Sequence, residues 1–482
     1  MEQMYTSDLG TRYLYVVLVV SWHWMQIQAQ TDPVEEVLGL KMALVVFRHG
    51  DRSALYSYPT DPHGEKIWPN GFAQLTTRGI QQEFNLGQFI RKRYNALLDS
   101  PIISNQVLLQ SSGLARTLKS AAAFAAGFDP PTPELAWNAA DLGSLWQPTA
   151  IFSRSVERDA IFGVSPCPRW VHLKNSVKLL PEAAALQLKY TNLTNYVMNH
   201  TQMRTFNFPR SYRALYDILY TQSQNGYRLP DWATPDVLSD IKYMADTVFH
   251  MSAGGNDRAD RIRPRIRGGN MLRVIMEELA RRVNGTTAGA QANTRLYLYS
   301  AHDENIGALL TALHLYDFDV EKGISSEMPN YASCLMFELF LNNTVRISFK
   351  NDRPDTPDTN PIVLTHPNCS TFCPLDELVN LTSPYFMDEE EWFEACKLAL
   401  VDSAASPTTG HNQDADETGN AYFLHVLIGC AFLLSIVAGL IALGVVLSIQ
   451  KQTQRNASVS SMLKPNLPRP GNETFLPGKN RS

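Results

Sequence analysis

Cysteine is scarce in this chain, with six residues among 482. That number excludes a small disulfide-held scaffold, so burial of apolar side chains must stabilise the fold. Neither sign of charge is in large excess, because 42 lysines and arginines face 47 aspartates and glutamates. A globally basic nucleic-acid binder is thereby excluded, and we expect no nucleic-acid partner. The 27 glycines and 28 prolines are too few and too scattered for a collagen-like or disordered repeat, and we find no internal repeat.

Two apolar segments are expected to lie outside the folded domain. Residues 1–29 contain Arg12, then an apolar run, then small and polar residues up to Ala29. This order is typical of a cleaved secretory signal peptide, although a buried first strand is the alternative. Residues 421–449 carry no charged side chain, which predicts one transmembrane helix. Acidic residues precede this segment and basic residues follow it, so we predict a single-pass type I membrane protein.

Polar segments flank the predicted span. Residues 403–420 lack apolar periodicity and are interpreted as a stalk, and residues 450–482 as a disordered cytoplasmic tail. Glycosylation signals precede the span at Asn192, Asn199, Asn284, Asn342, Asn368 and Asn380. Three further signals lie in the predicted tail and should stay unmodified: Asn456, Asn472 and Asn480.

The folded domain is expected to cover residues 37–396. Short apolar runs at 42–47, 107–109 and 296–299 have the character of strands buried on both faces, and helical stretches follow them. This alternation predicts an α/β domain with a mixed, mostly parallel sheet flanked by helices. A section from roughly 130 to 255, rich in aromatic residues and proline, is expected to be mostly helical. Functional sites of such folds lie at the carboxyl ends of the strands.

Polar residues follow each of these predicted strands. Arg48 and His49 come after the first, Arg116 lies beyond the second, and His302 and Asp303 follow the third. We therefore expect these residues, together with Arg52, to meet in one pocket. Arginine carries a forked and permanently charged donor set that matches phosphate oxygens, so the pattern predicts a phosphate site.

Two of these residues fit covalent catalysis. His49, as a neutral imidazole, is a candidate nucleophile that would form a phosphohistidine. Asp303 is the candidate general acid for the leaving oxygen, which favours an acid pH optimum. The alternatives are a core histidine at position 49, a helix N-cap at Asp303, and Glu304 as the proton donor. No metal or other cofactor is expected, because the arginines supply the positive charge.

A run of arginines precedes the expected helix at 268–283. Its positions are suited either to steering anionic substrates or to an ordinary solvated loop. The residues are Arg258, Arg261, Arg263, Arg265 and Arg267.

The pattern as a whole resembles the histidine acid phosphatase family. Residues 48–52 match the family's RHGxR motif, and Ser300-Ala301-His302-Asp303 matches its second motif. Further similarity occurs at 68–72, 74–76, 86–87, 267–269, 331–334 and 369–374, so the resemblance spans nearly the whole folded domain. The signal peptide, stalk and span are similar to those of the membrane-anchored lysosomal and testicular members, which share their catalytic domain with the prostatic type.

This resemblance implies a role for each matching residue. It implies His49 as the phosphorylated nucleophile and Asp303 as the proton donor. Arg48, Arg52, Arg116 and His302 would bind the phosphate, although Ala115 stands where the family usually has an acidic residue. The family fold is a sheet domain with a smaller, mainly helical inserted domain, and its members often form homodimers.

The resemblance also implies two disulfides, Cys167–Cys396 and Cys369–Cys373. A third family bridge would use Cys334, but Thr221 stands at the position of its partner, so Cys334 is expected to be a free, buried thiol.

The expected activity is hydrolysis of small phosphomonoesters at acid pH. A narrow specificity for lysophospholipids or inositol phosphates remains an alternative, as does a catalytically weak surface receptor of the same fold. The tail has no tyrosine and no acidic dileucine signal. We therefore favour the cell surface over the lysosomal or endosomal membrane.

Overall fold

The computed structural model describes residues 39–397, except 139–140, 209, 256–259, 287–288, 317–326 and 353–359. The predicted signal peptide (1–29), stalk (403–420), transmembrane helix (421–449) and tail (450–482) lie outside the described residues. Within the described part of the chain, no helix has both the length and the apolar character needed to cross a membrane. The membrane span at 421–449 therefore stays a prediction.

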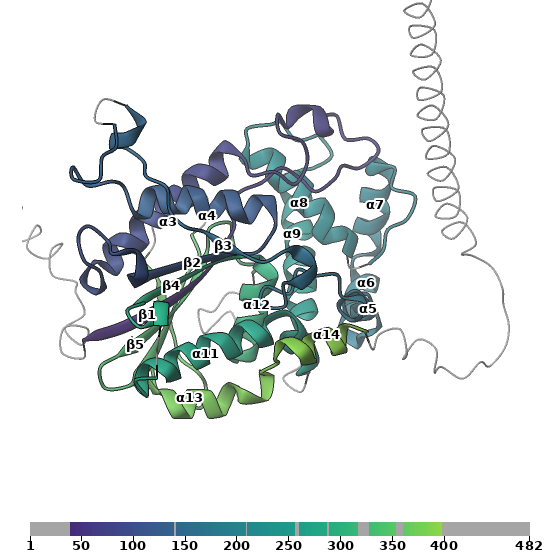
Figure 1. Ribbon diagram of the computed structural model, residues 1–482. Coiled ribbons are helices and arrows are strands. Elements are labelled where there is room, and N and C mark those ends of the chain that lie inside the picture. The colour runs from purple at the N-terminus through teal and green to yellow at the C-terminus, as the bar shows by residue number, and fades with distance from the viewer. Residues whose placement is uncertain are drawn as a thin grey trace, which may run out of the picture. The chain divides into compact units, whose positions relative to one another are not determined.

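A mixed sheet forms the centre of the described region (Figure 1). Its strands follow the order β3-β2-β4-β1-β5-β6-β7, and β8 pairs with β6. The strands are Leu40–Arg48 (β1), Val107–Ser111 (β2), Phe152–Ser153 (β3), Leu296–Ala301 (β4), Cys334–Phe340 (β5), Thr344–Lys350 (β6), Ile362–Leu364 (β7) and Cys373–Pro374 (β8).

The predicted α/β fold with a mixed sheet is confirmed, but the sheet is not mostly parallel. Strands β3, β2, β4 and β1 are parallel neighbours, whereas β5 to β8 pair antiparallel. The reason is local, because β5 and β6 are joined by a tight turn in which Asn343 has a positive φ of 63°. A turn this short permits only antiparallel pairing.

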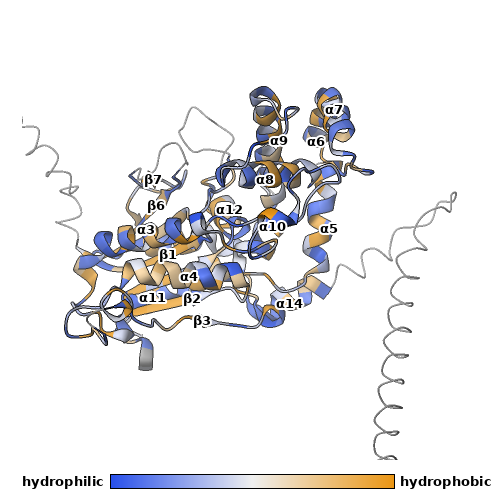
Figure 2. Ribbon diagram, turned by 90° about the horizontal axis from the view of Figure 1, so that it is seen from above, coloured by the Kyte–Doolittle hydropathy of each residue, from blue (hydrophilic) through white to orange (hydrophobic). Residues whose placement is uncertain are grey.

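β1 supplies both layers of the domain core. Successive side chains of a strand point to opposite faces, so its alternate residues enter two separate clusters. Helices α3 and α4 cover one face of the sheet, and α11, α12 and α13 pack in the cluster on the other (Figure 1). Figure 2 shows the strands β1 and β2 as largely hydrophobic, which fits burial on both faces. The covering helices are Thr77–Arg93 (α3), Ala115–Phe128 (α4), Asn270–Val283 (α11), Asp303–Ala312 (α12) and Leu375–Thr382 (α13).

A group of helices beside the sheet has its own apolar core, which includes Val197, Leu215 and Ile241. Figures 1 and 2 both show α6 to α9 together at one end of the sheet. The expected mostly helical section at 130–255 therefore begins later than its first residue, since 130–167 holds β3 and short turns. The helices are Pro168–Ser176 (α5), Pro181–Lys189 (α6), Thr191–Thr201 (α7), Arg210–Gln224 (α8) and Pro235–Ala253 (α9).

Shorter helical pieces complete the described chain. Helix α14 (Glu389–Lys397) follows α13, and Ile262–Pro264 (α10) leads into a π-helical turn at Arg265–Gly269 (η7), directly before α11. The 3-10 turns are Glu65–Ile67 (η1), Asn95–Leu97 (η2), Ser104–Gln106 (η3), Leu142–Ser144 (η4), Val156–Arg158 (η5), Val177–Leu179 (η6), Gly289–Gln291 (η8) and Ser383–Tyr385 (η10).

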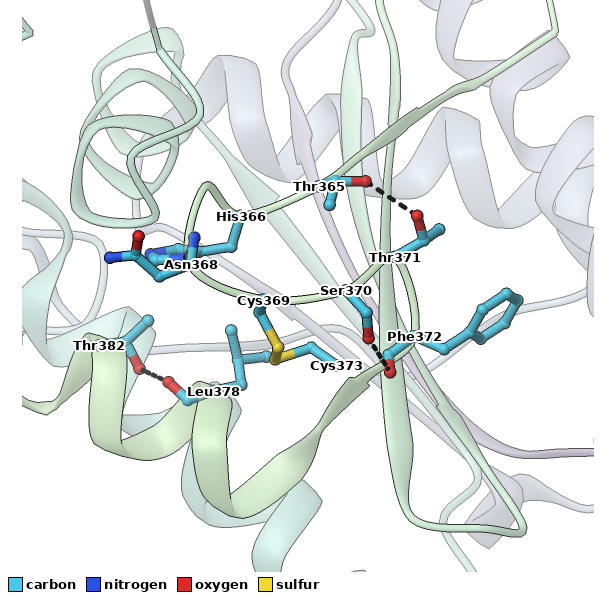
Figure 3. The surroundings of a disulfide bond; sticks show 10 residues. All are labelled: Thr365, His366, Asn368, Cys369, Ser370, Thr371, Phe372, Cys373, Leu378 and Thr382. Carbon is cyan, nitrogen blue, oxygen red and sulfur yellow. Dashed lines mark hydrogen bonds between the residues drawn. A yellow bond between two sulfur atoms is a disulfide. The ribbon is translucent and has the colours of Figure 1, made fainter.

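The described part of the chain contains two disulfides. Cys167, which precedes α5, is joined to Cys396 in α14 across 229 residues of sequence. Cys369 is joined to Cys373 in a small loop, where Thr365 and Thr371 also share a hydrogen bond of 3.1 Å (Figure 3). Both pairings are those that the family resemblance implies. Cys334, the first residue of β5, is a free and fully buried thiol.

Candidate active site

The parallel strands bring the predicted residues together at one edge of the sheet. β1 and β4 are hydrogen-bonded neighbours with Arg48 opposite Ala301, so His49 and His302 leave adjacent strands at the same level. Their ring centroids are 5.5 Å apart. A pocket of about 340 Å³ opens here, and all six predicted residues line it: Arg48, His49, Arg52, Arg116, His302 and Asp303.

His49 is buried in a defined tautomer, with 2% of its surface exposed. Its Nδ1 lies 2.9 Å from the carbonyl oxygen of Gly50, which can only accept, so Nδ1 carries the proton. Nε2 consequently has a free lone pair, and it accepts a hydrogen bond of 3.2 Å from Nε of Arg116. Burial, followed by the charges of Arg116 and Arg48, holds the pKa of His49 well below the usual value. These effects favour the neutral form of the imidazole.

Gly50 is required where it stands. A Cβ at this position would lie 2.4 Å from the carbonyl oxygen of Gly79 in α3. A Cβ at Gly79 would in turn lie 2.1 Å from the carbonyl oxygen of Asp51. The two glycines let the loop after β1 rest directly on the first turn of α3, and this contact positions His49.

His302 occupies the N-cap position of α12. Its Nε2 lies 2.9 Å from Oγ of Ser112, which follows β2, so three neighbouring strands contribute to one network. Asp303 is the first residue of the helix rather than its N-cap, which corrects the alternative considered from the sequence. Helix α12 begins one residue earlier than a cap at Asp303 would allow, and this leaves the Asp303 carboxylate available to the pocket.

The three predicted arginines have different partners. Arg48 donates to the carbonyl oxygen of Pro329 at 2.6 Å, and its guanidinium lies 4.0 Å from the ring centre of Tyr331. Arg52 forms an ion pair of 2.9 Å with Asp217. Arg116, in the first turn of α4, lines the pocket, and its only hydrogen bond to another described side chain goes to His49.

Arg116 is the arginine least compensated by carboxylates. Burial lowers its pKa to about 10, and the nearby charge of Arg52 adds to the lowering. An anion bound beside Arg116 would relieve both effects. The site therefore carries an unbalanced cation at the place where a phosphate would contact His49.

Asp303 is held by two guanidinium groups. Its Oδ2 lies 3.0 Å from Nη2 of Arg48 and 3.3 Å from Nη2 of Arg213. Burial alone raises the pKa of Asp303, but the charges of Arg48 and Arg213 outweigh it, so the pKa lies below the usual range. The charges of Arg48 and Arg213 therefore favour the ionised form of Asp303, whereas the sequence predicts a readily protonated acid.

Glu304 has a more completely satisfied carboxylate. It accepts from Nε of Arg267 at 2.7 Å, from Arg213 at 3.1 Å and from the indole of Trp170 at 3.2 Å. Lys174 lies 3.6 Å away. Burial raises the pKa of the Glu304 carboxylate, but the charges of Arg267, Lys174 and Arg213 lower it by more. The pKa of Glu304 therefore also lies below the usual range.

Three pocket residues that contact the predicted site residues were not themselves predicted as site residues: Arg213, Asp217 and Tyr331. Arg213 contacts Asp303 across 90 residues of sequence, and no local motif marks it. Tyr331 could have been found from the sequence, because it is the first residue of the stretch 331–334 that is similar to the family. Within its described part, the arginine run before α11 is mixed, because Arg261 is exposed whereas the next three arginines of the run are paired with carboxylates. Arg263 pairs with Asp260, Arg265 with Glu391 and Arg267 with Glu304, and only Arg267 reaches the pocket.

One group of candidate metal ligands occurs among the described residues. The ligand atoms of Cys369, Cys373 and Glu377 lie within 4.8 Å of one another. However, the two sulfur atoms are bonded to each other, as Figure 3 shows, so neither is a thiolate. This group is a disulfide loop beside a glutamate.

Comparison with known proteins agrees with this geometry. Residues 39–350 match the histidine phosphatase superfamily (branch 2). Lysosomal acid phosphatase of Xenopus laevis is 32% identical over 396 residues, covering 81% of this chain and 84% of that protein. Prostatic acid phosphatase of Rattus norvegicus is 30% identical over 362 residues, covering 74% and 89%.

Solved structures share the fold. The phytase from Citrobacter braakii superimposes with a TM-score of 0.55 at 19% identity, over 73% of this chain and 99% of that one. A Hafnia alvei phytase gives 0.54 at 15% identity, over 73% and 98%. These similarities support the fold alone. Together with the sequence matches they confirm the family resemblance: the chain belongs to the histidine phosphatase superfamily, branch 2, and is an acid phosphatase of that family.

Proposed function

We propose that the protein hydrolyses phosphomonoesters at acid pH through a phosphohistidine on His49. The observation that carries this proposal is the state of that imidazole. Nδ1 is committed to the Gly50 carbonyl, and Nε2 keeps its lone pair in a pocket lined by six arginines, among them Arg48, Arg52 and Arg116. A neutral nucleophile in acid and a cationic phosphate site are what in-line attack on a phosphate ester requires.

Binding of the substrate exchanges contacts within the pocket. Arg48, Arg52, Arg116 and His302 bind the phosphoryl oxygens, and Arg116 leaves His49 as it turns toward them. Nε2 then attacks phosphorus, the phosphorus–nitrogen bond forms, and the bond to the leaving oxygen breaks. In the second step water attacks phosphorus, its proton passes to the Asp303 carboxylate, and the phosphorus–nitrogen bond breaks, which returns Nε2 to its neutral form.

Asp303 acquires its proton through this exchange. Arg48 stabilises the ionised carboxylate of Asp303 at 3.0 Å. A bound phosphate draws Arg48 away and adds negative charge nearby, and both changes raise the pKa of Asp303. In acid, Asp303 then becomes protonated and donates to the leaving oxygen. The acid pH optimum therefore follows from the bound state of the site.

The test is His49→Ala in the purified outer domain, by which we mean the folded domain expected at residues 37–396. Turnover of an aryl phosphate and trapping of a phosphoenzyme should both be lost, while the circular dichroism spectrum stays the same. His172→Ala is the matched control, because His172 is an exposed histidine on α5. A His49 variant with near-normal turnover would contradict the assignment. A metal chelator should have little effect, and strong loss that zinc restores would indicate a metal enzyme instead.

The assembly and location of the protein are part of the same proposal. We propose a type I anchor through residues 421–449, with exposure mainly at the cell surface. Several relatives are named lysosomal acid phosphatases, and their location supports the lysosomal alternative. Labelling of intact cells with a membrane-impermeant reagent separates the two locations.

A homodimer is supported by exposed apolar side chains beside the edge strand β3 and in the segment before it. Size-exclusion chromatography with light scattering tests this proposal. The exposed residues are Leu135, Trp137, Leu142, Leu145, Trp146 and Phe152.

A further inference from the structure

A second group of cations lines the same pocket beyond the proposed phosphate site. We name it the outer cluster, and it consists of Lys174 from α5, Arg210 and Arg213 from α8, and Arg267 from η7. These residues surround one carboxylate, that of Glu304, which contacts Lys174, Arg213 and Arg267. Arg210 is exposed, and it forms no ion pair within the described part of the chain.

The outer cluster leaves the pocket with surplus positive charge. The inner site has Arg48, Arg52 and Arg116 facing Asp303 and Asp217, so the inner and outer groups together hold seven cations against three carboxylates. A phosphate dianion compensates two of the four surplus charges. About two positive charges then stay uncompensated among partly buried side chains, and a second anion beside them would be favourable.

Mutual repulsion within the outer cluster is already visible. Burial lowers the pKa of Lys174, and its three cationic neighbours add to the lowering, against the opposing effect of Glu304. The side chain of Lys174 is 30% exposed and that of Arg213 is 27% exposed, so both can be reached from the pocket. Like charges held together beside a cavity are a recurring feature of anion-binding sites.

The outer cluster lies on the side of the leaving group. Arg213 contacts Asp303 at 3.3 Å and Glu304 at 3.1 Å, so the cluster begins directly beside the proposed proton donor. Asp303 must approach the oxygen that leaves with the alcohol. The carbon skeleton of the alcohol therefore extends from the inner site toward Lys174 and Arg210.

We propose that the outer cluster binds a second anionic group on the alcohol part of the substrate. The substrate class is then small phosphomonoesters whose alcohol carries a carboxylate or a further phosphate a few bonds from the scissile ester. This inference deepens the proposed function and rests on it.

The test compares matched substrates on the purified outer domain. Ethyl phosphate and 2-phosphoglycolate have similar size and differ by a carboxylate, while propyl phosphate and propane-1,3-diol bisphosphate differ by a phosphate. In at least one pair, we expect kcat/KM to be roughly tenfold higher for the substrate whose alcohol part carries the carboxylate or second phosphate, since each new charge-assisted contact contributes about 1.5 kcal/mol. The pair with the larger ratio identifies the anion that the cluster prefers.

Three variants locate the effect. Arg210→Gln combined with Lys174→Met should reduce the preference at least fivefold through KM, and Arg210→Lys should largely retain it. Arg228→Gln removes the same charge from a surface side chain that is 86% exposed, and it should keep the preference. Ethyl phosphate turnover without any preference in the wild type, or a preference that survives the double variant, overturns the subsite while the proposed function stands. Absence of turnover and of phosphohistidine on every substrate overturns the proposed function itself.

Discussion

At the residue scale, Asp303 and Glu304 are adjacent carboxylates that differ in their suitability as proton donor. Asp303 is paired with Arg48, which the phosphate of the substrate is proposed to draw away, whereas Glu304 accepts from Trp170 and Arg267. We therefore expect binding of the scissile phosphate to change the charge compensation of Asp303 more than that of Glu304, whose cationic partners belong to the outer cluster. This difference favours Asp303 as the group that gains and donates a proton.

Substitution of the proton donor should depend on the leaving group. We expect Asp303→Asn to lower kcat on alkyl phosphates by about 10²-fold or more, and on activated aryl phosphates far less, because only a basic leaving oxygen needs a proton. Steady-state kinetics on both substrate types measures this difference. Glu304→Gln is the matched comparison and should lose activity by similar factors on both. The reverse pattern would move the role of proton donor to Glu304.

Arg213 should set the pH dependence of Asp303. Its charge lowers the pKa of this carboxylate, so Arg213→Met should raise that pKa. The donor then keeps its proton to higher pH, and the alkaline limb of kcat on ethyl phosphate shifts upward. Arg213→Lys should preserve the wild-type limb, and Arg228→Met should have no effect. A uniform loss of kcat with an unmoved limb would mean that Arg213 acts only through packing.

The sequence could predict the residues of the inner site because short motifs carry them. His49 and its flanking arginines lie within five positions. The parallel pairing of β1 with β4 then places His302 and Asp303 beside them. Arg213 could not be found in this way, since its role depends on where α8 packs. The low pKa of the Asp303 carboxylate was not predicted for the same reason, because the charge of Arg213 contributes to it.

At the scale of elements, strand burial was predicted better than strand pairing. The apolar run at 42–47 correctly indicated β1, with all of its central residues buried. The antiparallel half of the sheet was not foreseen, because β5 carries Glu338 at its centre. That glutamate is only 1% exposed, and the tertiary partners Arg93 and Arg346 satisfy it at 2.7 and 2.8 Å. A sequence pattern does not reveal partners of this kind.

The packing of α3 on α4 depends on glycine. Gly127 lies inside the last turn of α4, and a Cβ there would be 2.0 Å from the carbonyl oxygen of Phe84. Gly87 makes the reciprocal approach, 2.1 Å from the carbonyl oxygen of Phe124. The two helices therefore touch backbone to backbone.

Gly127→Ala should force these helices apart. Helix propensity alone would stabilise the variant by about 1 kcal/mol, but the clash with Phe84 has no flexible atom to relieve it. We expect a net destabilisation of about 1–3 kcal/mol, measured by urea unfolding of the outer domain. Ala122→Gly, at an exposed site of the same helix, gives the propensity effect by itself. Equal or greater stability of Gly127→Ala would show that the helices can separate without loss.

At the scale of the whole molecule, the glycosylation of each asparagine depends on the side of the membrane on which its segment of the chain lies. All six predicted glycosylation asparagines before residue 397 have exposed side chains, and they are distributed over helices, turns and loops of the described domain. Accessibility therefore does not prevent modification of any of them. Asn456, Asn472 and Asn480 have the same local signal and differ only in lying beyond the predicted span.

Topology rather than local sequence should decide which of these asparagines are modified. In the full chain made by secretory cells, we expect glycans only before residue 397, because segments that stay in the cytoplasm never meet the transferase. Mass spectrometry of peptides after enzymatic deglycosylation in heavy-oxygen water identifies each occupied site. Arg12→Glu with Lys451→Glu and Arg455→Glu weakens the charge bias that orients the span, and it should reduce outer glycosylation before it changes catalysis. Glycans on the tail of the wild-type chain would contradict the type I orientation, and with it the acidic lumenal or external site at which His49 is proposed to act.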